Sequence, residues 1–466
     1  MAASLRANTT RLAPAARFSR AVLIGTAVLC ALYVAFAFQL HRPTVMKVVP
    51  AVLAVALLAT MRLSEDLRLS IALMVLPAVV TLHGFGVYMA RVKAPPAVAA
   101  AKAGRPFDSR SKWEIVADMR AEGIEAYNVA NPKSVLEELD GLPIAAARVI
   151  PLGSVGSVKT VYCNEGGAYS IYDADERGFN NPAGLWDGPV DVAVIGDSYT
   201  QGACVPPDQN FVAHVRARRP HTINLGMGGN GPLLELAAIR EYLSQLKPKV
   251  VLWAYFRNDM PDLSVEKRSP TLMRYLDPSF SQGLAAKQAD INAGLRTMLD
   301  ERGPAAPRWP SFLASIGLTR ASTPIWIQDF VMGEDNSAAM PVIRHDALAL
   351  FAQSRSGEAS TPPDFELFGK VLTQARDEVA AWGGALHFVY IADLYAFGKV
   401  KKLHPLRDQV LETARKAGLP IIDTSPAFQE LTDLDTIRYH PASHCSPGGY
   451  ALIGKVINEH LDVHFP

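Results

Sequence analysis

Short apolar runs alternate with amphipathic segments through the second half of this 466-residue chain. The strand-like runs are residues 192–195, 222–225, 250–254, 385–391 and 420–422. The segments with apolar residues three and four apart are residues 211–218, 232–246, 366–382, 406–417 and 450–461. Alternation of this kind predicts an α/β fold, in which helices cover both faces of a parallel sheet.

The front of the chain has a different character, because three apolar stretches open it. They cover about residues 21–40, 45–61 and 69–90. A helix that crosses a membrane needs roughly 20 predominantly apolar residues, so we expect a membrane anchor of three transmembrane helices. The second stretch is the shortest, and a buried or re-entrant helix is the alternative reading for it.

Basic residues set the expected orientation of this anchor. Four of them precede the first stretch: Arg6, Arg11, Arg17 and Arg20. The excess of positive charge predicts that residues 1–20 are cytoplasmic. Three spans then put everything after residue 90 outside the cytoplasm, in a multi-pass protein of the cytoplasmic membrane. Two spans would leave that part inside.

Changes in composition divide the remainder. Residues 91–108, rich in Ala, Pro and Lys, predict a linker. Residues 109–190 form an N-terminal extension of the main domain, which covers residues 191–466. Residues 261–360 interrupt the strand and helix alternation, which indicates a large insertion. The net charge of +1 gives no reason to expect a nucleic-acid partner.

Three cysteines lie outside the apolar stretches, namely Cys163, Cys204 and Cys445. Three cysteines allow one disulfide and one leftover thiol. We favour a bridge between Cys163 and Cys204, with Cys204–Cys445 as the second choice. Three free thiols remain an alternative.

The most informative motif, Gly196-Asp197-Ser198, directly follows the first strand-like run. The turn would leave the Ser198 hydroxyl at the carboxyl edge of the sheet, where open α/β sheets bind their ligands. A serine hydroxyl becomes a nucleophile when a base takes its proton, and the resulting oxyanion needs hydrogen-bond donors. Taken alone, the motif is a weak signal and is more typical of a plain turn.

Residues that could supply these partners follow the later runs. A loop with four glycines, residues 224–231, follows the second run and offers backbone N–H groups as oxyanion donors. Asn258 follows the third run and could donate from its side-chain amide. His444 stands before the last helix, in a turn marked by Pro447 and two glycines, and is the candidate general base.

In this order the motifs resemble the SGNH or GDSL-type serine hydrolases, over about residues 190–465. The resemblance implies a flavodoxin-like α/β/α sandwich that uses neither a metal nor an organic cofactor. It implies Ser198 as nucleophile and His444 as base. The oxyanion donors would be Ser198, Gly229 and Asn258, with Gly226 the less favoured glycine.

Two departures from that family's pattern affect the expected site. The family often has a glycine where this chain has Phe256, and it commonly has an aspartate two or three residues before the histidine. Here those two positions are Ala442 and Pro441. Asp435 is the nearest acid before His444, so it is the candidate partner, and a Ser–His dyad is the alternative.

The expected function is that of a membrane-anchored serine esterase. By analogy of architecture, its substrates would be ester bonds such as the O-acyl groups of envelope glycans. Acyl transfer to a glycan is the first alternative. A non-catalytic binding domain on the same fold is the second, because of the missing acid.

Overall fold

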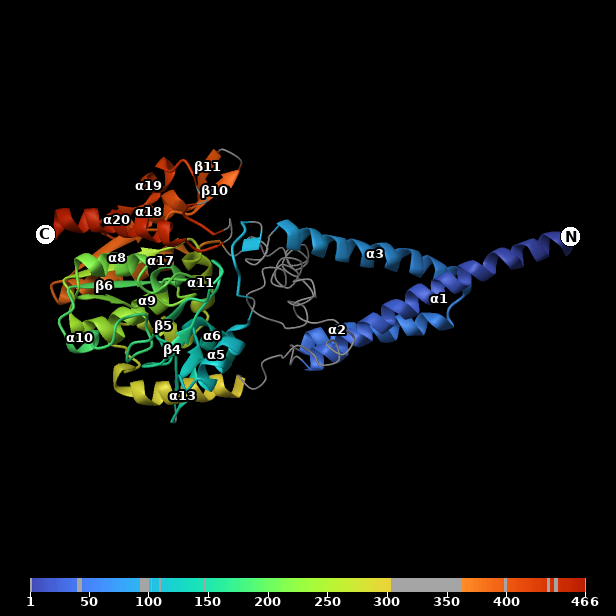
Figure 1. Ribbon diagram of the computed structural model, residues 1–466, viewed down its shortest axis with the longest axis horizontal. Coiled ribbons are helices and arrows are strands. Elements are labelled where there is room, and N and C mark those ends of the chain that lie inside the picture. Colours follow the sequence, from blue (N-terminus) through green and yellow to red (C-terminus); the bar gives the residue numbers. More distant parts are fainter. Residues whose placement is uncertain are drawn as a thin grey trace. The chain divides into compact units, whose positions relative to one another are not determined.

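The computed structural model describes residues 2–39, 44–92, 100–101, 103–108, 110–145, 147–302, 362–397, 400–433, 436–439 and 443–465. The chain divides into two compact units, with residues 1–95 in one, and residues 96–306 and 357–466 in the other. Figure 1 labels their elements.

A five-stranded parallel sheet forms the centre of the larger unit. Its strands are β6 (Val192–Gly196), β7 (Thr222–Asn224), β8 (Val250–Tyr255), β9 (Ala385–Tyr390) and β12 (Ile421–Asp423). They lie in the order β12-β9-β8-β6-β7. This is the strand order of flavodoxin-like sheets, in which the switch point lies between the first and third strands. Here those strands are β6 and β8.

Helices cover both faces of this sheet (Figure 1). One face packs on α8 (Phe211–Arg218), α19 (Ser425–Glu430) and α20 (Pro447–His464). The other packs on α9 (Pro232–Ala238), α17 (Phe365–Ala381) and α18 (Arg407–Lys416). A π-helical turn η3 (Ile239–Leu243) and α10 (Ser244–Leu246) continue α9. The expected alternation of strands and helices is therefore confirmed, with ends that shift by one to three residues.

The two cores on either side of the sheet follow from the side-chain alternation of its strands. Along β8, Val251 and Trp253 enter the core beneath α9 and α17. Val250 and Leu252 enter the core beneath α8 and α20. All residues of β6 and β8 are buried. Both faces of these strands are covered, which is why they read as continuous apolar runs.

The predicted N-terminal extension packs into the same core as the sheet. Its helices are α5 (Lys112–Ala121), α6 (Pro132–Leu139) and the 3-10 turn η2 (Leu185–Asp187). Its strands are β1 (Ala126–Asn128), β2 (Leu142–Ile144), β3 (Ala147–Val149), β4 (Lys159–Val161) and β5 (Ile171–Asp173). Val135, Leu142 and Phe179 are buried in one cluster with the residues of β8. The extension is thus part of the larger unit.

The predicted insertion begins with ordered helices. They are α11 (Asp259–Glu266), α12 (Pro270–Met273), η4 (Arg274–Leu276), η5 (Ala285–Lys287) and α13 (Gln288–Arg302). Leu263, Tyr275 and Leu295 of this segment are fully buried in the core beneath α9. Residues 303–361, the rest of the predicted insertion, lie outside the described residues. A hairpin of β10 (Leu394–Phe397) and β11 (Val400–Leu403) follows β9.

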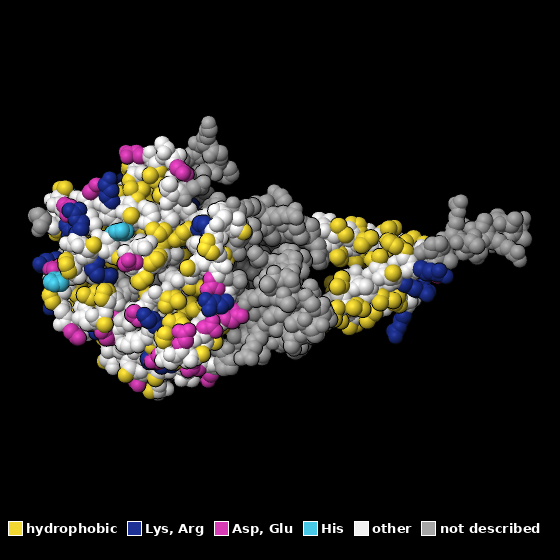
Figure 2. All heavy atoms as spheres, viewed as in Figure 1, with side chains coloured by type: hydrophobic (Ala, Val, Ile, Leu, Met, Phe, Trp, Pro, Cys, Tyr) yellow, Lys and Arg dark blue, Asp and Glu magenta, His cyan; other side chains and the backbone are white. Residues whose placement is uncertain are grey.

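The smaller unit contains α1 (Ala2–Gln39), α2 (Thr44–Ala59), η1 (Thr60–Arg62) and α3 (Glu65–Val92). Large apolar side chains face outward from these helices, and Figure 2 shows them on the visible surface of the unit. Leu29, Val55 and Met74 are each more than half exposed. The buried residues between the helices are smaller on average and include Ala27 and Ala72. Small residues inside and large apolar residues outside are typical of helices packed in lipid.

One described helix is long and apolar enough to cross a membrane, at Ala15–Val34. It overlaps the first predicted span. The second predicted span coincides with a shorter apolar helix, Pro50–Arg62. The third lies in α3, where side chains from residue 82 onward are outside the described set. Among the described residues, one helix therefore qualifies as a membrane span where three were expected, and the expected multi-pass topology is not supported. The second helix is too short by itself to cross roughly 30 Å of hydrocarbon.

Candidate active site

The segment that carries Ser198 is shaped by a glycine and a helix cap. Gly196 ends β6 with φ +154°, and a side chain there would lie 2.7 Å from the carbonyl oxygen of Ala254. Asp197 then caps the short helix α7 (Ser198–Gln201), because its carboxylate accepts the Tyr199 N–H at 2.9 Å. This turn places the half-buried Ser198 at the carboxyl edge of the sheet, next to the switch point.

His444 lies beside Ser198 although it follows it by 246 residues in the chain. An isolated β-bridge between Arg438 and Cys445 holds its segment. Ser446 caps α20 immediately afterwards by accepting the Gly449 N–H. In this position His444 Nε2 lies 2.9 Å from Ser198 Oγ. The two residues that sequence analysis paired are thus within hydrogen-bond distance.

The acid next to His444 is Glu165, which sequence analysis missed. One carboxylate oxygen of Glu165 lies 3.0 Å from His444 Nδ1, and the other accepts the backbone N–H of His444 at 2.7 Å. Two contacts to one residue orient the ring and leave Nε2 directed at the serine. Asp435, the acid predicted from sequence, lies outside the described residues. The position beside Nδ1 is occupied by an acid from the extension instead.

A disulfide ties the loop that carries Glu165 to the segment that carries Ser198. Cys163, two residues before Glu165, is bonded to Cys204, six residues after Ser198, with Cα atoms 5.0 Å apart. This is the pairing that the sequence favoured. Cys445, the leftover thiol, is free and buried, and burial raises its pKa to about 12. It therefore stays protonated at neutral pH.

The end of the predicted linker also braces the Glu165 loop. The Arg105 guanidinium donates to the Gly166 carbonyl at 3.0 Å, and the Asp108 N–H donates to the Gly167 carbonyl at 2.7 Å. Asn164 donates back to the Asp108 carbonyl at 3.0 Å. Residues 103–108 thus belong to the packed unit. The first part of the predicted linker, residues 93–99, lies outside the described residues.

The proton affinity of His444 reflects two opposing effects. Burial by itself would lower the pKa of the imidazole, but the Glu165 carboxylate, through its charge and its hydrogen bond, outweighs burial and raises that pKa above its ordinary value. A raised pKa makes the ring a stronger base toward the Ser198 hydroxyl. This electrostatic arrangement is the one that a catalytic base requires.

Backbone N–H groups beside Ser198 are available as oxyanion donors. Within the described residues, the N–H groups of Ser198 and Gly229 donate to no protein group. The Gly226 N–H, the less favoured candidate, is already donated to Asn224 Oδ1 at 2.8 Å. Gly228, which directly precedes Gly229, donates its N–H to Gln201 Oε1 at 2.7 Å. The loop therefore lies against α7, the short helix that begins at Ser198. The geometry therefore favours Gly229 over Gly226.

Asn258 is held between two carboxylates. Its side-chain Nδ2 donates to Asp262 Oδ2 at 3.0 Å. The same amide hydrogen-bonds to Asp197 and partly offsets the burial that raises the pKa of that acid to about 6. Ser198 Oγ is 3.3 Å from Asp197 Oδ2. The amide of Asn258 is thus anchored at Asp262 and directed toward the residues around the nucleophile.

Phe256 stands where the related family often has glycine. The centre of its ring lies 4.0 Å from the centre of the Tyr199 ring.

Three residues around the nucleophile carry atoms that can bind a metal ion. Ligand atoms of Glu165, Cys204 and His444 all lie within 4.8 Å of one another. The Cys204 sulfur is bonded to Cys163 and supplies no thiolate. The remaining two ligand atoms are hydrogen-bonded to each other. This donor set therefore suits a proton relay better than it suits a cation.

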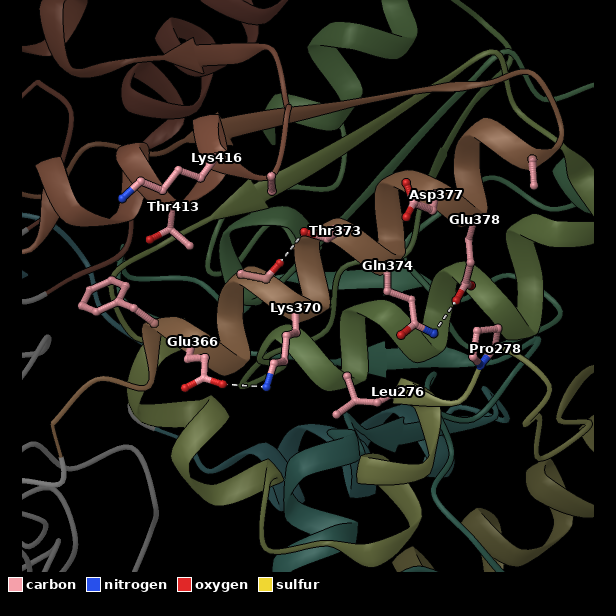
Figure 3. Close-up of a pocket in the computed structure, with 14 residues that line it drawn as sticks. Leu276, Pro278, Glu366, Lys370, Thr373, Gln374, Asp377, Glu378, Thr413 and Lys416 are labelled. Atoms are coloured by element: carbon pink, nitrogen blue, oxygen red, sulfur yellow. Dashed lines mark hydrogen bonds and ion pairs between the residues drawn. The ribbon is translucent and has the colours of Figure 1, made fainter.

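A groove of about 990 Å³ lies elsewhere on the larger unit, along α17 (Figure 3). Polar pairs line it, such as Glu366 with Lys370 at 2.7 Å and Gln374 with Glu378 at 3.1 Å. None of Ser198, His444 and Glu165 contributes to its lining. The relay does not open into this groove.

Comparisons with known protein families and with curated proteins find no match. Solved structures that are similar include TesA (11% identity, TM-score 0.30, 58% of this chain and 98% of that chain). A member of the lipolytic G-D-S-L family from Veillonella parvula has 12% identity and a TM-score of 0.30, and covers 57% of this chain and 96% of its own. An acetyl xylan esterase has 9% identity and a TM-score of 0.30, over 58% and 99%. These likenesses are weak, so the chemistry of the site follows from its own geometry.

Proposed function

We propose that this protein is a serine esterase that works through an acyl-enzyme. The observation that carries the proposal is the continuous relay of Ser198, His444 and Glu165, in which the two side-chain contacts measure 2.9 and 3.0 Å. The three residues come from separate segments of the chain. A serine, a base and an acid in this arrangement activate a hydroxyl for attack on a carbonyl.

In the first half of the reaction Ser198 Oγ attacks the ester carbonyl carbon, and its proton passes to His444 Nε2. The negative charge that develops on the carbonyl oxygen is stabilised by the N–H groups of Ser198 and Gly229 and by the Asn258 amide. The intermediate then collapses, and the leaving alkoxide takes the proton from Nε2. Throughout, Glu165 stays ionised and stabilises the imidazolium.

In the second half a water molecule gives its proton to His444 Nε2 and attacks the acyl group on Ser198. The acyl–oxygen bond to the serine breaks, and Ser198 Oγ recovers the proton. The products are a carboxylic acid and an alcohol. The sequence of steps needs no metal and no organic cofactor, as the resemblance also implied.

Labelling with a fluorophosphonate probe tests the nucleophile. We expect the wild-type protein to label and to hydrolyse a chromogenic acetyl ester, and we expect Ser198→Ala to do neither. Ser279→Ala is the matched control, because Ser279 is exposed. Equal labelling of the wild type and Ser198→Ala would contradict the proposal. It would favour a non-catalytic binding domain, whose main support in the sequence was the missing acid.

The substrate class that we propose is the O-acyl groups of envelope glycans, by analogy of architecture alone. Acyl transfer to a sugar hydroxyl is the competing reaction, because either water or a sugar can attack the acyl-enzyme. The two are separated by supplying an acetyl ester with and without a glycan acceptor. Release of free acetate that is unchanged by the acceptor supports hydrolysis, and acetylated acceptor supports transfer.

We further propose that the smaller unit anchors the enzyme in the membrane and that residues after 95 lie outside the cytoplasm. Helix Ala15–Val34 supports the anchor, and the outward-facing apolar side chains of α2 and α3 support their contact with lipid. The disulfide Cys163–Cys204 supports an oxidising compartment. A reporter fused after Pro466 that is active only in the cytoplasm would contradict this orientation. Recovery of the protein from a wash that strips peripheral proteins would contradict the anchor.

A further inference from the structure

Lys133 belongs to the N-terminal extension and ends beside the candidate oxyanion hole. It lies in the first turn of α6, and its Nζ is 2.6 Å from Asp262 Oδ1. The side chain of Asp262 is only 6% exposed, and that of Lys133 is 28% exposed. An ion pair with one largely buried partner is screened less than a pair on the surface. This contact therefore constrains both side chains.

The two oxygens of Asp262 link Lys133 to Asn258. While Oδ1 faces the lysine, Oδ2 accepts the Asn258 amide at 3.0 Å. The stem of the lysine also lies along Gly229, since a Cβ added to that glycine would be 3.1 Å from Lys133 Cδ. Gly229 has φ +77°, a conformation that favours glycine. Lys133 thus lies against one of the two further oxyanion donors selected from the sequence, Gly229, and is linked to the other, Asn258, through Asp262.

Lys133 brings a positive charge to a region of mostly acidic side chains, because further carboxyl groups face Asp262 from the surrounding elements. They are Glu137 of α6, Glu266 of α11, Glu235 of α9, Asp259 and Asp197. Burial raises the pKa of Asp262, and Lys133 and the Asn258 amide oppose that rise. Burial raises the pKa of Glu235 and Asp259 well above their usual range, and the neighbouring carboxyl groups add to that rise. Lys133 is the cation that contacts Asp262, and its charge favours the ionised form of that carboxyl group.

We infer that Lys133 is a positioning residue for the oxyanion hole, acting through Asp262 on the side-chain amide of Asn258. An ionised Asp262 takes one amide hydrogen of Asn258. The other hydrogen, which is shared with Asp197 in the free protein, is thereby held where the substrate carbonyl oxygen can take it over. A protonated Asp262 holds that amide less firmly, because a charged acceptor makes the stronger hydrogen bond. The inference rests on the proposed esterase function. It adds a second contribution of the extension to the site, beside Glu165.

The test is the kinetics of Lys133→Met and Lys133→Arg from pH 6 to pH 9, with a small acetyl ester and the full-length protein. At pH 7 we expect kcat of Lys133→Met to fall about 10- to 100-fold, less than the loss of a whole oxyanion donor. KM should change less than about 2-fold, because the lost interaction forms in the transition state. Raising the pH ionises Asp262 again, so the deficit should shrink toward pH 9. Lys133→Arg should keep most of kcat.

Lys159→Met is the matched control. Lys159 also belongs to the extension and pairs with Asp173 at 2.7 Å, but at an exposed position. Its kcat should equal that of the wild type. If Lys133→Met folds poorly, Asp262→Asn replaces it, because that change removes the charge and keeps the shape. Its deficit should not shrink at high pH.

Three results would overturn the inference. The first is a wild-type kcat in Lys133→Met. The second is a deficit that is the same at every pH and is not rescued by arginine, which would indicate structural support alone. The third is a wild-type protein without esterase activity, which would also remove the proposed function. The first two leave the proposed function intact.

Discussion

The candidate active site has two halves of different origin. The sheet-edge half, with Ser198, Asn258 and His444, lies at the carboxyl edge of the central sheet. The extension half, with Glu165 and Lys133, comes from residues 105–170 and packs over that edge. The extension and the sheet share a hydrophobic core, in which Val135 of α6 and Trp253 of β8 are both buried. The sheet-edge half can be found from strand order and local motifs, and the extension half cannot.

The two halves of the site are held in place in different ways. At the edge of a parallel sheet, the carboxyl ends of strands that are distant in sequence always meet. An acid that arrives from another layer needs its own attachment. Here the attachment consists of the Cys163–Cys204 bridge and the hydrogen bonds of Arg105 and Asp108 to the Glu165 loop. If the comparison is right, both halves are required, and changes to either one lower activity in a distinct way.

The largest effect within the extension half is expected for Glu165→Gln. The glutamine amide places an NH2 group, which is a donor, where one of the two carboxylate oxygens accepts from His444, so one of the two contacts is lost. We expect kcat to fall about 10³- to 10⁴-fold, because the imidazole loses its orientation and its counter-charge. Steady-state kinetics with an acetyl ester measures the loss.

Asp435→Asn is the control for that experiment, since Asp435 was the acid favoured by sequence. Its kcat should stay within about 2-fold of the wild-type value. The opposite pattern, with a large loss in Asp435→Asn and a small one in Glu165→Gln, would contradict the relay described here.

The next effect belongs to the sheet-edge half. Asn258→Ala removes one oxyanion donor, and we expect kcat to fall about 10²- to 10³-fold with a small change in KM. Asn292→Ala is a suitable control, because Asn292 accepts the Gly156 N–H through Oδ1 and does not contact the relay. A loss confined to KM would show that Asn258 binds the substrate without stabilising its transition state.

Breaking the disulfide should loosen the extension half with a smaller effect on the chemistry. We expect the double variant Cys163→Ser/Cys204→Ser to lose about 4 kcal/mol of unfolding free energy, since the bridge closes a loop of 41 residues. Its kcat should fall about 10-fold, because Glu165 is then held by fewer contacts. Thermal denaturation and kinetics measure the two effects. Cys30→Ala, which removes a free thiol, should change neither.

The smallest effect is a shift in pH dependence. His444 must be neutral to accept the Ser198 proton, so kcat/KM should rise as the pH passes the pKa of His444 in the folded protein. Glu165 raises that pKa above its ordinary 6.5, so the acid limb should lie above pH 6.5. In Glu165→Gln the remaining activity should show a limb at lower pH. An unchanged limb would mean that Glu165 does not act on His444.

Local patterns predicted the sheet and its helices closely because their signals lie within single segments. The apolar run of β8 and the amphipathic spacing of α8 each report their own environment. The expected membrane spans at the front were less reliable, because the length of an apolar stretch does not show where its helix begins and ends. Glu165 carried no local signal at all. One indirect signal did exist, because the favoured Cys163–Cys204 pairing places residue 165 near Ser198.

The sequence by itself predicted the succession of strands and helices along the chain, the turn that carries Ser198, and His444 as the candidate base, because these depend on periodicity and on short motifs. Only the tertiary structure decided which acid supports His444 and which cation faces Asp262. Those contacts join Glu165 to a residue 279 positions later, and Lys133 to one 129 positions later. Contacts over such separations depend on how the extension packs against the sheet and its helices. No periodic pattern in the sequence reports that packing.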